Sequence, residues 1–181
     1  MSTVDASSAV GALAPAPAGT CTVRRAAAGD RPALERMLTR CTGQTRYRRF
    51  HGPVNVFPER YLTEALSGSP LHFALVACLE EDAREDGTAD DGTVVALASC
   101  RAVDEGVAEL GILVEDRWQR RGVGDCLLRE IVAYAARTGL RALQAQVLAD
   151  QPWIVGMLRR HGTCTVAGAG QALHVTVSLP R

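Results

Sequence analysis

The chain has 181 residues, of which 47% are hydrophobic and 22% are charged, an ordinary balance for one globular domain with its own core. Its twenty basic residues, all arginine, equal its twenty acidic residues in number, so the charge gives no sign of binding to nucleic acid or membrane. No apolar run reaches transmembrane length, and the first residues lack the pattern of a signal peptide. We therefore expect a cytoplasmic protein.

Six cysteines and four histidines are scattered along the sequence without C-x-x-C pairs or the spacing of metal ligands. Several of the cysteines lie in apolar runs, as buried free thiols do. This pattern favours a reducing compartment and predicts neither a disulfide framework nor a bound metal.

Residues 1–20 are rich in alanine and proline and contain no aromatic residue. Such a segment buries too little apolar surface to offset the entropy of ordering, so we expect a disordered tail before a single domain at 21–181. Within that domain, apolar periodicity predicts helices capped by Asp30 and Asp150 and another at 59–66. The sequence TRYRRFHGP, which begins at Thr45, is a cluster of arginine and aromatic side chains without a predicted element.

Seven runs of apolar and β-branched residues predict strands. They lie at 21–26, 71–79, 93–103, 107–114, 142–148, 163–167 and 173–179. Residues 80–92 carry seven acidic side chains and are interpreted as a solvated connection within an antiparallel hairpin. The order of elements predicts an α/β fold, with a mixed but predominantly antiparallel sheet and about four flanking helices.

Residues 107–139 combine a mostly buried strand, a polar turn and a long amphipathic helix, which Gly122 and Gly124 open and Gly139 ends. Glycines let a ligand approach the backbone, and the free N–H groups of a helix N-terminus favour an anion. The turn has no Walker lysine and no third glycine at dinucleotide-fold spacing, so a P-loop or Rossmann site is disfavoured. The turn is therefore a candidate anion site of another kind.

The strand end Ile-Leu-Val, the turn QRRGVG and the following helix together resemble the acyl-CoA-binding motif of the GNAT N-acetyltransferase superfamily. The order of elements fits this resemblance over about residues 23–179. The resemblance implies acetyl-CoA as co-substrate, with its pantetheine arm on the strand backbone and its pyrophosphate on the turn. The cofactor-binding residues that it implies are Ile112, Leu113, Val114, Gln119, Arg120, Arg121, Gly122, Val123, Gly124, Asp125 and Asp150. Gly111 has no side chain to obstruct the arm, although a bulge in the strand would also explain it.

Glu109 is the only charged side chain in the strand VAELGILV. An amine that is protonated at neutral pH must lose a proton before it attacks a thioester, and a nearby carboxylate can accept that proton. Family members that use a glutamate base often have it at this place, so we expect Glu109 to be the general base in an apolar surround. The alternative is a glutamate at an exposed strand edge.

The last helix departs from the family pattern. Many members have an asparagine at its start and a tyrosine further along that protonates the leaving thiolate, whereas the matching positions here are Asp150 and Met157. Asp150 is interpreted as an N-cap and Met157 as core packing, so water or a residue such as Ser99 would have to serve as the acid. Cys126 lies near a helix N-terminus, which lowers the pKa of a thiol, but buried packing is the simpler interpretation.

The arginine and aromatic cluster, together with Ala108-Glu109 and Leu148-Ala149-Asp150, resembles bacterial protein-lysine acetyltransferases. That resemblance implies a lysine of a partner protein as the acceptor. We expect the protein to be a monomer or homodimer. Two alternatives stay open: an acetyltransferase for a small amine (a polyamine, an amino acid or an aminoglycoside), and a module that binds acyl-CoA without turnover.

Overall fold

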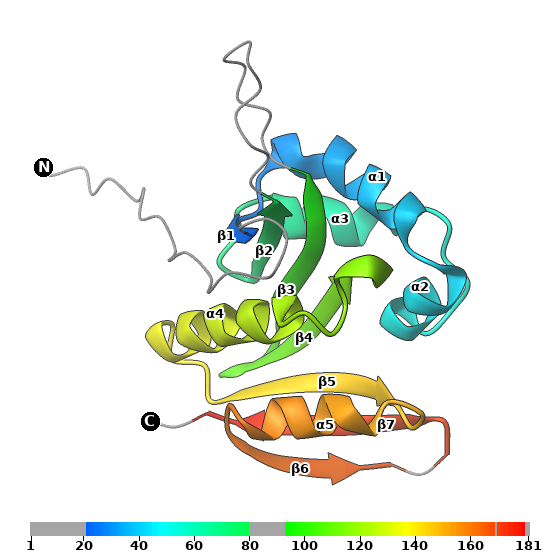
Figure 1. Cartoon of the computed structure of the whole chain (residues 1–181). Coiled ribbons are helices and arrows are strands. Elements are labelled where there is room, and N and C mark those ends of the chain that lie inside the picture. The colour runs from blue at the N-terminus through cyan, green and yellow to red at the C-terminus, as the bar shows by residue number, and fades with distance from the viewer. Residues whose placement is uncertain (1–20, 80–92, 169, 180–181) are drawn as a thin grey trace, which may run out of the picture.

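The computed structural model describes residues 21–79, 93–168 and 170–179, so the predicted tail at 1–20 and the acidic segment at 80–92 lie outside the described residues. Seven strands form one sheet in the order β1-β2-β3-β4-β5-β7-β6 (Figure 1). The strands are β1 (Cys21–Arg25), β2 (His72–Leu79), β3 (Val94–Asp104), β4 (Val107–Val114), β5 (Ala142–Leu148), β6 (Thr163–Ala167) and β7 (Ala172–Ser178). The helices are α1 (Arg31–Arg40), α2 (Gly43–Phe50), α3 (Glu59–Leu66), α4 (Val123–Arg137) and α5 (Pro152–Arg159), with short 3-10 turns η1 (Ala28–Asp30) and η2 (Asp116–Trp118).

The predicted fold class is confirmed. Each of the seven strands begins and ends within one residue of its predicted bounds, and every neighbouring pair is antiparallel except β4 with β5. The described residues form five α-helices where about four were expected, because the arginine and aromatic cluster forms α2. Thr42 begins this helix, and its side chain accepts a hydrogen bond from the Thr45 N–H.

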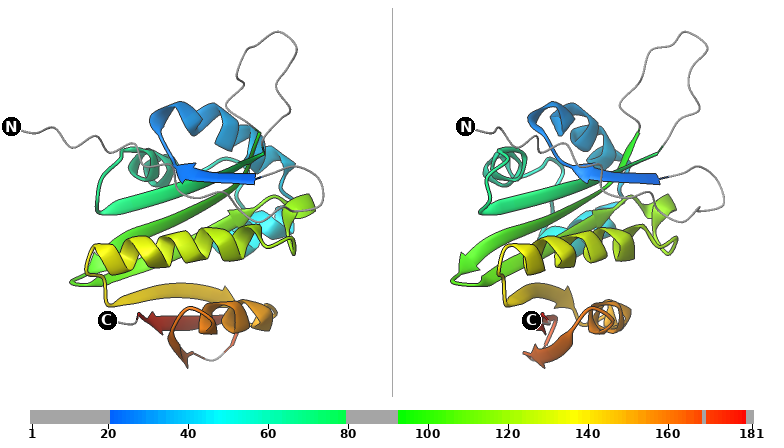
Figure 2. Two further views of the ribbon diagram at one scale, coloured as in Figure 1. Left: turned by 60° about the vertical axis from the view of Figure 1, so that its left-hand side comes forward. Right: turned by 90° about the vertical axis from the view of Figure 1, so that its left-hand side faces the viewer.

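Helices cover both faces of the sheet and give the molecule two cores (Figure 2). On one face, the apolar stripe of α4 packs Leu127 and Ile131 against inward side chains of β3 and β4 such as Val95 and Leu110. On the other face, α1 and α3 pack against β2 and β3, and Leu34 of α1 is completely buried there. Among the described residues, no helix is both long enough and apolar enough to span a membrane.

Both ends of α4 depend on glycine. Gly122 precedes the helix with φ 83°, and Gly139 follows it with φ 76°, a region that other residues rarely adopt. The Leu140 N–H donates to the Ala135 carbonyl and the Gly139 N–H to that of Ala136, which together form a Schellman motif. The predicted start and stop of this helix are therefore confirmed.

The two aspartates expected as helix caps, Asp30 and Asp150, instead pair with arginine side chains. The Asp30 carboxylate accepts from the Arg24 guanidinium at 2.6 and 2.8 Å and from the Ala27 N–H, and it makes no capping bond to α1. Asp150 lies one residue before the N-cap of α5, which is Gln151, and its carboxylate pairs with Arg48. The N-cap interpretation of Asp150 is wrong because a long-range ion pair holds its side chain.

The strands β4 and β5 separate after a short parallel contact. Their only paired positions are Val107 with Ala142, Ala108 with Leu143, and Glu109 with Gln144. Within the described ranges of the chain, the remaining edge of β4, from Leu110 onward, has no strand partner on this side, while β5 stays paired with β7 to its end. This divergence opens a cleft in the middle of the sheet, with free backbone groups along one wall.

Candidate active site

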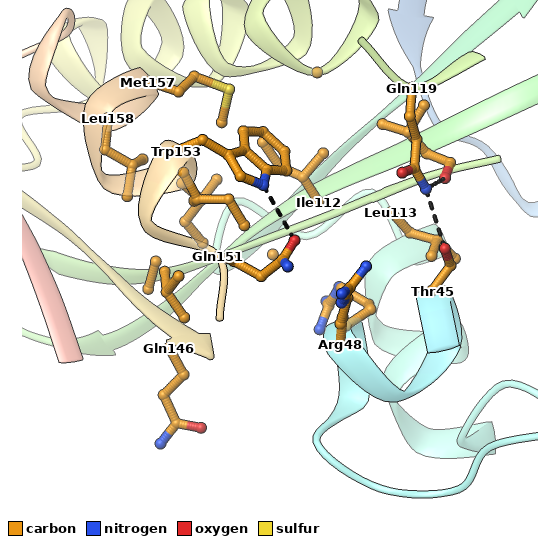
Figure 3. A pocket seen from close by; sticks show the side chains of 18 of the residues that line it. Thr45, Arg48, Ile112, Leu113, Gln119, Gln146, Gln151, Trp153, Met157 and Leu158 are labelled. Carbon is orange, nitrogen blue, oxygen red and sulfur yellow. Dashed lines mark hydrogen bonds between the residues drawn. The ribbon is translucent and has the colours of Figure 1, made fainter. Parts of the chain in front are cut away.

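A cavity of about 570 Å³, which we call the cleft cavity, fills the opening between β4 and β5. Figure 3 shows Thr45 and Arg48 entering it from α2 on one side, and Trp153 and Met157 from α5 on the other. Nine of the residues predicted for the site line it: Glu109, Ile112, Leu113, Val114, Gln119, Arg120, Gly122, Gly124 and Asp125. The structure thus brings together residues that the sequence spreads over a strand, a turn and a helix.

Three predicted residues do not line this cavity. The Val123 side chain is buried in the core, and the Arg121 guanidinium lies 5.3 Å from the centre of the Trp118 ring. Asp150 reaches the cavity only through Arg48, with 3.0 Å between its Oδ2 and the arginine Nη2. A ligand in the cleft can therefore meet Arg121 and Val123 only through their backbone.

The turn before α4 is shaped to hold an anion. Arg120 has φ 58° and Gly122 has φ 83°, so two left-handed residues stand close together in front of the free N–H groups of the helix. Such alternation turns backbone N–H groups towards one another in a concave nest that binds anions. The helix dipole adds to this preference for negative charge.

The end of α5 is tied to this turn. Asp125, in the first turn of α4, accepts hydrogen bonds from Arg160 at 2.6 Å and from His161 at 3.3 Å. Burial on its own raises the pKa of Asp125, but these two partners outweigh it and hold the pKa below its usual range. Arg160 also lines the cavity, so this pairing places a further guanidinium beside the anion-binding turn.

The lining of the cleft cavity suits acetyl-CoA. Four arginines border it against two acidic residues, so it presents net positive charge to phosphate groups. Its other side is apolar and comes from α5 and β4, where Trp153, Met157 and Ile112 lie (Figure 3). Ile154 of α5 also belongs to this lining. The strand edge of β4 between these two regions can pair with the amide groups of the pantetheine arm of acetyl-CoA.

Helix α2 is anchored against the same turn by hydrogen bonds. The Asp116 carboxylate accepts from the Thr42 N–H and from the hydroxyls of Thr42 and Thr45, each at 2.8 Å. Burial raises the pKa of Asp116, yet these hydrogen bonds lower it further than burial raises it. The Gln119 side-chain amide donates hydrogen bonds to the Thr45 hydroxyl and to the Val114 carbonyl. Gln119, which was predicted to bind the cofactor, therefore uses its amide to hold α2 against the end of β4.

The Glu109 carboxylate lies at the point where β4 and β5 part. It is ion-paired with Arg101 on β3, and about half of its side chain is exposed. The apolar surround expected for this glutamate is therefore wrong, and the exposed strand edge describes its surroundings better. Its position in the cleft is nonetheless as predicted.

A second cavity of about 370 Å³ lies on the α3 side of β4. Its lining is mostly polar and comprises Arg49, Arg60, Tyr61, Glu64, His72, Ser99, Arg101, Glu109, Leu110 and Gly111. Four of these residues also line the cleft cavity: Arg49, Glu109, Leu110 and Gly111. The two cavities therefore meet at the middle of β4, with the Glu109 carboxylate on the border.

Gly111 pairs regularly with Ser99 on β3, so the bulge considered for it is wrong. The Arg49 guanidinium lies directly over Gly111, in space that a Cβ atom would take. Arg49 donates to the Tyr61 hydroxyl at 3.0 Å, and that hydroxyl donates to the buried Ser99 Oγ at 3.0 Å. A hydrogen-bonded chain thus reaches the border between the cavities.

Sequence reasoning missed the functional importance of α2. Arg48 and Arg49 both line the cleft cavity, whereas the sequence pattern shows them only as members of a basic and aromatic cluster. The signal that could have found the helix is Thr42, whose hydroxyl caps the first turn by accepting a hydrogen bond from the Thr45 N–H. Met157, expected to pack in the core, packs against the core and also lines the cleft cavity.

The Cys126 thiol is buried in the core, as expected. Burial raises its pKa, although Arg129 beside it acts in the opposite direction. In the described parts of the chain, no group of histidine, cysteine, aspartate and glutamate side chains could hold a metal ion.

Solved structures share this fold. The GNAT domain of S. lividans PAT superposes with a TM-score of 0.77 at 20% identity, over 93% of this chain and 96% of that one. A GCN5-related N-acetyltransferase from Kribbella flavida gives 0.64 at 21% identity, over 86% and 95%. The protein yncA from Salmonella typhimurium, solved with its cofactor acetyl-CoA, gives 0.65 at 18% identity, over 89% and 95%. None of the curated proteins matches the sequence.

The family model for the acetyltransferase (GNAT) family matches residues 49–163, which is more than half of the chain. The matched segment contains both strands of the cleft, the anion-binding turn, α4 and α5. The resemblance found in the sequence is thereby confirmed. The chain belongs to the acetyltransferase (GNAT) family of enzymes, which use acetyl-CoA as co-substrate.

Proposed function

We propose that this enzyme transfers the acetyl group of acetyl-CoA directly to an amine, with Glu109 as the general base. The observation that supports this proposal is the meeting of two cavities at residues 109–111. One cavity is basic and has a free strand edge, which suits the donor, and the other is a separate polar space for the acceptor. Direct transfer needs such an arrangement, because donor and acceptor must be held together.

The chain's own residues have distinct roles towards the donor. Bound acetyl-CoA supplies an acetyl group activated as a thioester. The backbone of Ile112, Leu113 and Val114 pairs with its pantetheine arm, and the N–H groups from Arg120 to Asp125 hold its pyrophosphate. Arg121 and Val123 take part only through their N–H groups, and Asp150 acts by orienting Arg48.

Glu109 accepts the proton that the amine must lose. The carboxylate borders both cavities, which is where a group that acts on the attacking nitrogen must lie. The ion pair with Arg101 holds the carboxylate in this position. Because the side chain is half exposed, the proton can pass on to solvent afterwards.

We propose two classes of acceptor, each with its own support. A lysine of a partner protein is supported by the sequence resemblance and by the match along nearly the whole length of the GNAT domain of S. lividans PAT. A small amine is supported by the second cavity, which gathers charges of both signs in a limited volume. The cytoplasmic location, the single domain and the monomeric or homodimeric state stay predictions.

The first experiment is a calorimetric titration of acetyl-CoA into the purified protein. Micromolar binding is expected, together with release of CoA when a lysine peptide or a small amine is added. Binding without CoA release for any amine would make the chain a non-catalytic acyl-CoA-binding module. No binding to the folded protein would overturn the proposal.

A further inference from the structure

The second cavity carries one positive charge that the described residues do not neutralise. It is lined by three arginines and two glutamates, and two of the arginines are paired within it: Arg60 with Glu64 at 2.7 Å, and Arg101 with Glu109. The third, Arg49, has no carboxylate partner among the residues that the structure describes. A cavity with an unmatched guanidinium favours an anionic group on its ligand.

Arg49 is held in place by aromatic rings. Its guanidinium carbon lies 4.8 Å from the centre of the Phe50 ring and 5.1 Å from that of Tyr61, within the range of cation–π attraction. It also donates to the Tyr61 hydroxyl and covers Gly111. These contacts leave the cation pre-organised at the border of the cavities, beside the place of acetyl transfer.

His72 provides a second, independent sign of a ligand. It lines the same cavity and is 3% exposed, yet neither of its ring nitrogens has a hydrogen-bond partner among the described residues. Its ring centre lies 5.6 Å from that of Tyr61, so His72 and Arg49 contact the same ring. Buried polar groups are nearly always hydrogen-bonded. The His72 Nδ1 lies 3.8 Å from the Glu64 carboxylate, and a polar ligand in this cavity can supply a missing partner for a ring nitrogen.

We propose that the second cavity binds an α-amino acid, whose carboxylate pairs with Arg49 and whose amine faces Glu109. A guanidinium binds a carboxylate through two parallel hydrogen bonds, so Arg49 fixes both the position and the orientation of the acceptor. The inference rests on the N-acetyltransferase function proposed above and selects the small amine of the two acceptor classes. A lysine side chain is the poorer match, because its ammonium would leave Arg49 without a counter-charge.

The acetyl transfer needs no reactant other than acetyl-CoA, the amino acid and water. The α-ammonium gives one proton to Glu109, and its nitrogen forms a C–N bond to the acetyl carbon as the C–S bond breaks. The thiolate of CoA takes a proton from water, Glu109 releases the proton that it accepted to solvent, and the amide nitrogen loses its remaining extra proton directly to solvent. The products are an N-acetyl amino acid and free CoA.

The test compares amines that differ in one group. Release of CoA is measured with each common L-amino acid and with its α-carboxamide, which keeps the amine and removes the negative charge. A lysine peptide with blocked ends is the third probe. We expect kcat/KM for the preferred amino acid to exceed that for its amide by at least about tenfold, the factor that corresponds to about 1.4 kcal/mol.

Variants of Arg49 assign the effect to this side chain. Arg49→Gln should raise KM for the amino acid at least about tenfold, with a smaller change in kcat, and should abolish the preference over the amide. Arg49→Lys should restore part of the preference, since it keeps the charge but loses the planar fork. Arg36→Gln, which removes an exposed arginine of α1, is the matched control and should change neither value.

The outcomes separate this inference from the function on which it rests. Equal use of amides and acids, transfer to the lysine peptide alone, or a preference that survives in Arg49→Gln would each overturn the amino-acid proposal and leave the acetyltransferase intact. Failure of every amine to release CoA would overturn the acetyltransferase function itself. A thermal unfolding curve for each variant shows whether a loss of activity comes from unfolding.

Discussion

Glu109 and Arg101 stand directly opposite each other on β4 and β3, and their side chains form an ion pair on the surface that borders both cavities. About half of each side chain is exposed, so the pair contributes little to the stability of the fold. Its consequence is chemical: under the proposed function, the ion pair holds the carboxylate at the point where donor and acceptor meet.

Glu109→Gln should lower kcat by about 10²- to 10⁴-fold, because the amide cannot accept the proton of the amine. Binding of acetyl-CoA, followed by calorimetry, should be unchanged within a few-fold, since the donor pairs with other residues. Glu105→Gln, in the exposed turn between β3 and β4, is the control and should retain full activity. A Glu109→Gln enzyme with normal turnover would exclude this residue as the base.

Gly122→Asp should weaken acetyl-CoA binding at least about tenfold more than Gly122→Asn does. Asparagine and aspartate have nearly the same shape, and both tolerate the left-handed conformation that Gly122 adopts, so the two variants differ mainly in charge. The negative charge lies beside the N–H groups assigned to the pyrophosphate. Equal loss in both variants would mean that strain, and not repulsion of phosphate, sets the effect.

The ion pair between Arg48 and Asp150 should contribute less than about 1 kcal/mol to stability, because both side chains are partly exposed. A double-mutant cycle with Arg48→Gln and Asp150→Asn, followed by urea unfolding, measures this coupling. The coupling should shrink as salt is added. A coupling above about 2 kcal/mol would show that the pair is shielded from solvent more than its exposure indicates.

Leu127→Ala should lower the free energy of unfolding by about 2–5 kcal/mol, since the side chain is completely buried beneath α4 and leaves a cavity when it is truncated. Arg137→Ala, on the exposed last turn of the same helix, should change it by less than about 0.5 kcal/mol. Comparable effects at the two positions would contradict the assignment of the buried face.

Stability should fall as the pH drops from about 7, and His72 should account for part of that fall. Burial lowers the pKa of His72, helped by Arg101 and Arg49 and opposed by Glu64. Below about pH 6.5, His72 binds a proton in the unfolded chain but stays neutral in the folded protein. Stability therefore falls with pH until the pH reaches the lowered pKa of the folded state. Below that point His72 adds no further loss.

The free energy of unfolding at pH 7.5 and at pH 5.5 tests this prediction. His72→Gln should lose less stability between the two values than the unchanged protein. The exposed His174 provides the control, because His174→Gln should leave the difference unaltered. Burial lowers the pKa of His51 too, so some pH dependence will persist in His72→Gln.

The strands could be predicted from the sequence because each is a short apolar run bounded by turn residues, a pattern that is typical of buried strands. The helix α2 could not be predicted in the same way. Its first turn has a capping threonine, but its buried face is small, and its position depends on Asp116, which follows it by about seventy residues in the chain. Long-range hydrogen bonds of this kind leave no local pattern.

In the candidate site, too, local motifs could be predicted from the sequence and long-range contacts could not. The turn with Arg120 and Gly122 was found because its glycines and the helix after it form a contiguous motif. The second cavity was not found, because it draws Arg49, Tyr61 and His72 from three elements that only the fold brings together. The surroundings of Glu109 were misjudged for a related reason: Arg101 faces it from the neighbouring strand.

The short contact between β4 and β5 also has a consequence for how the domain unfolds. Across the residues that the structure describes, only three pairs of β-sheet register connect β1 to β4 with β5, β7 and β6. Under the proposed function, a bound pantetheine arm pairs with the free edge of β4 and so extends the contact between the two parts of the sheet. Amide hydrogen exchange should then show two units that open separately in the free protein and together once acetyl-CoA is bound.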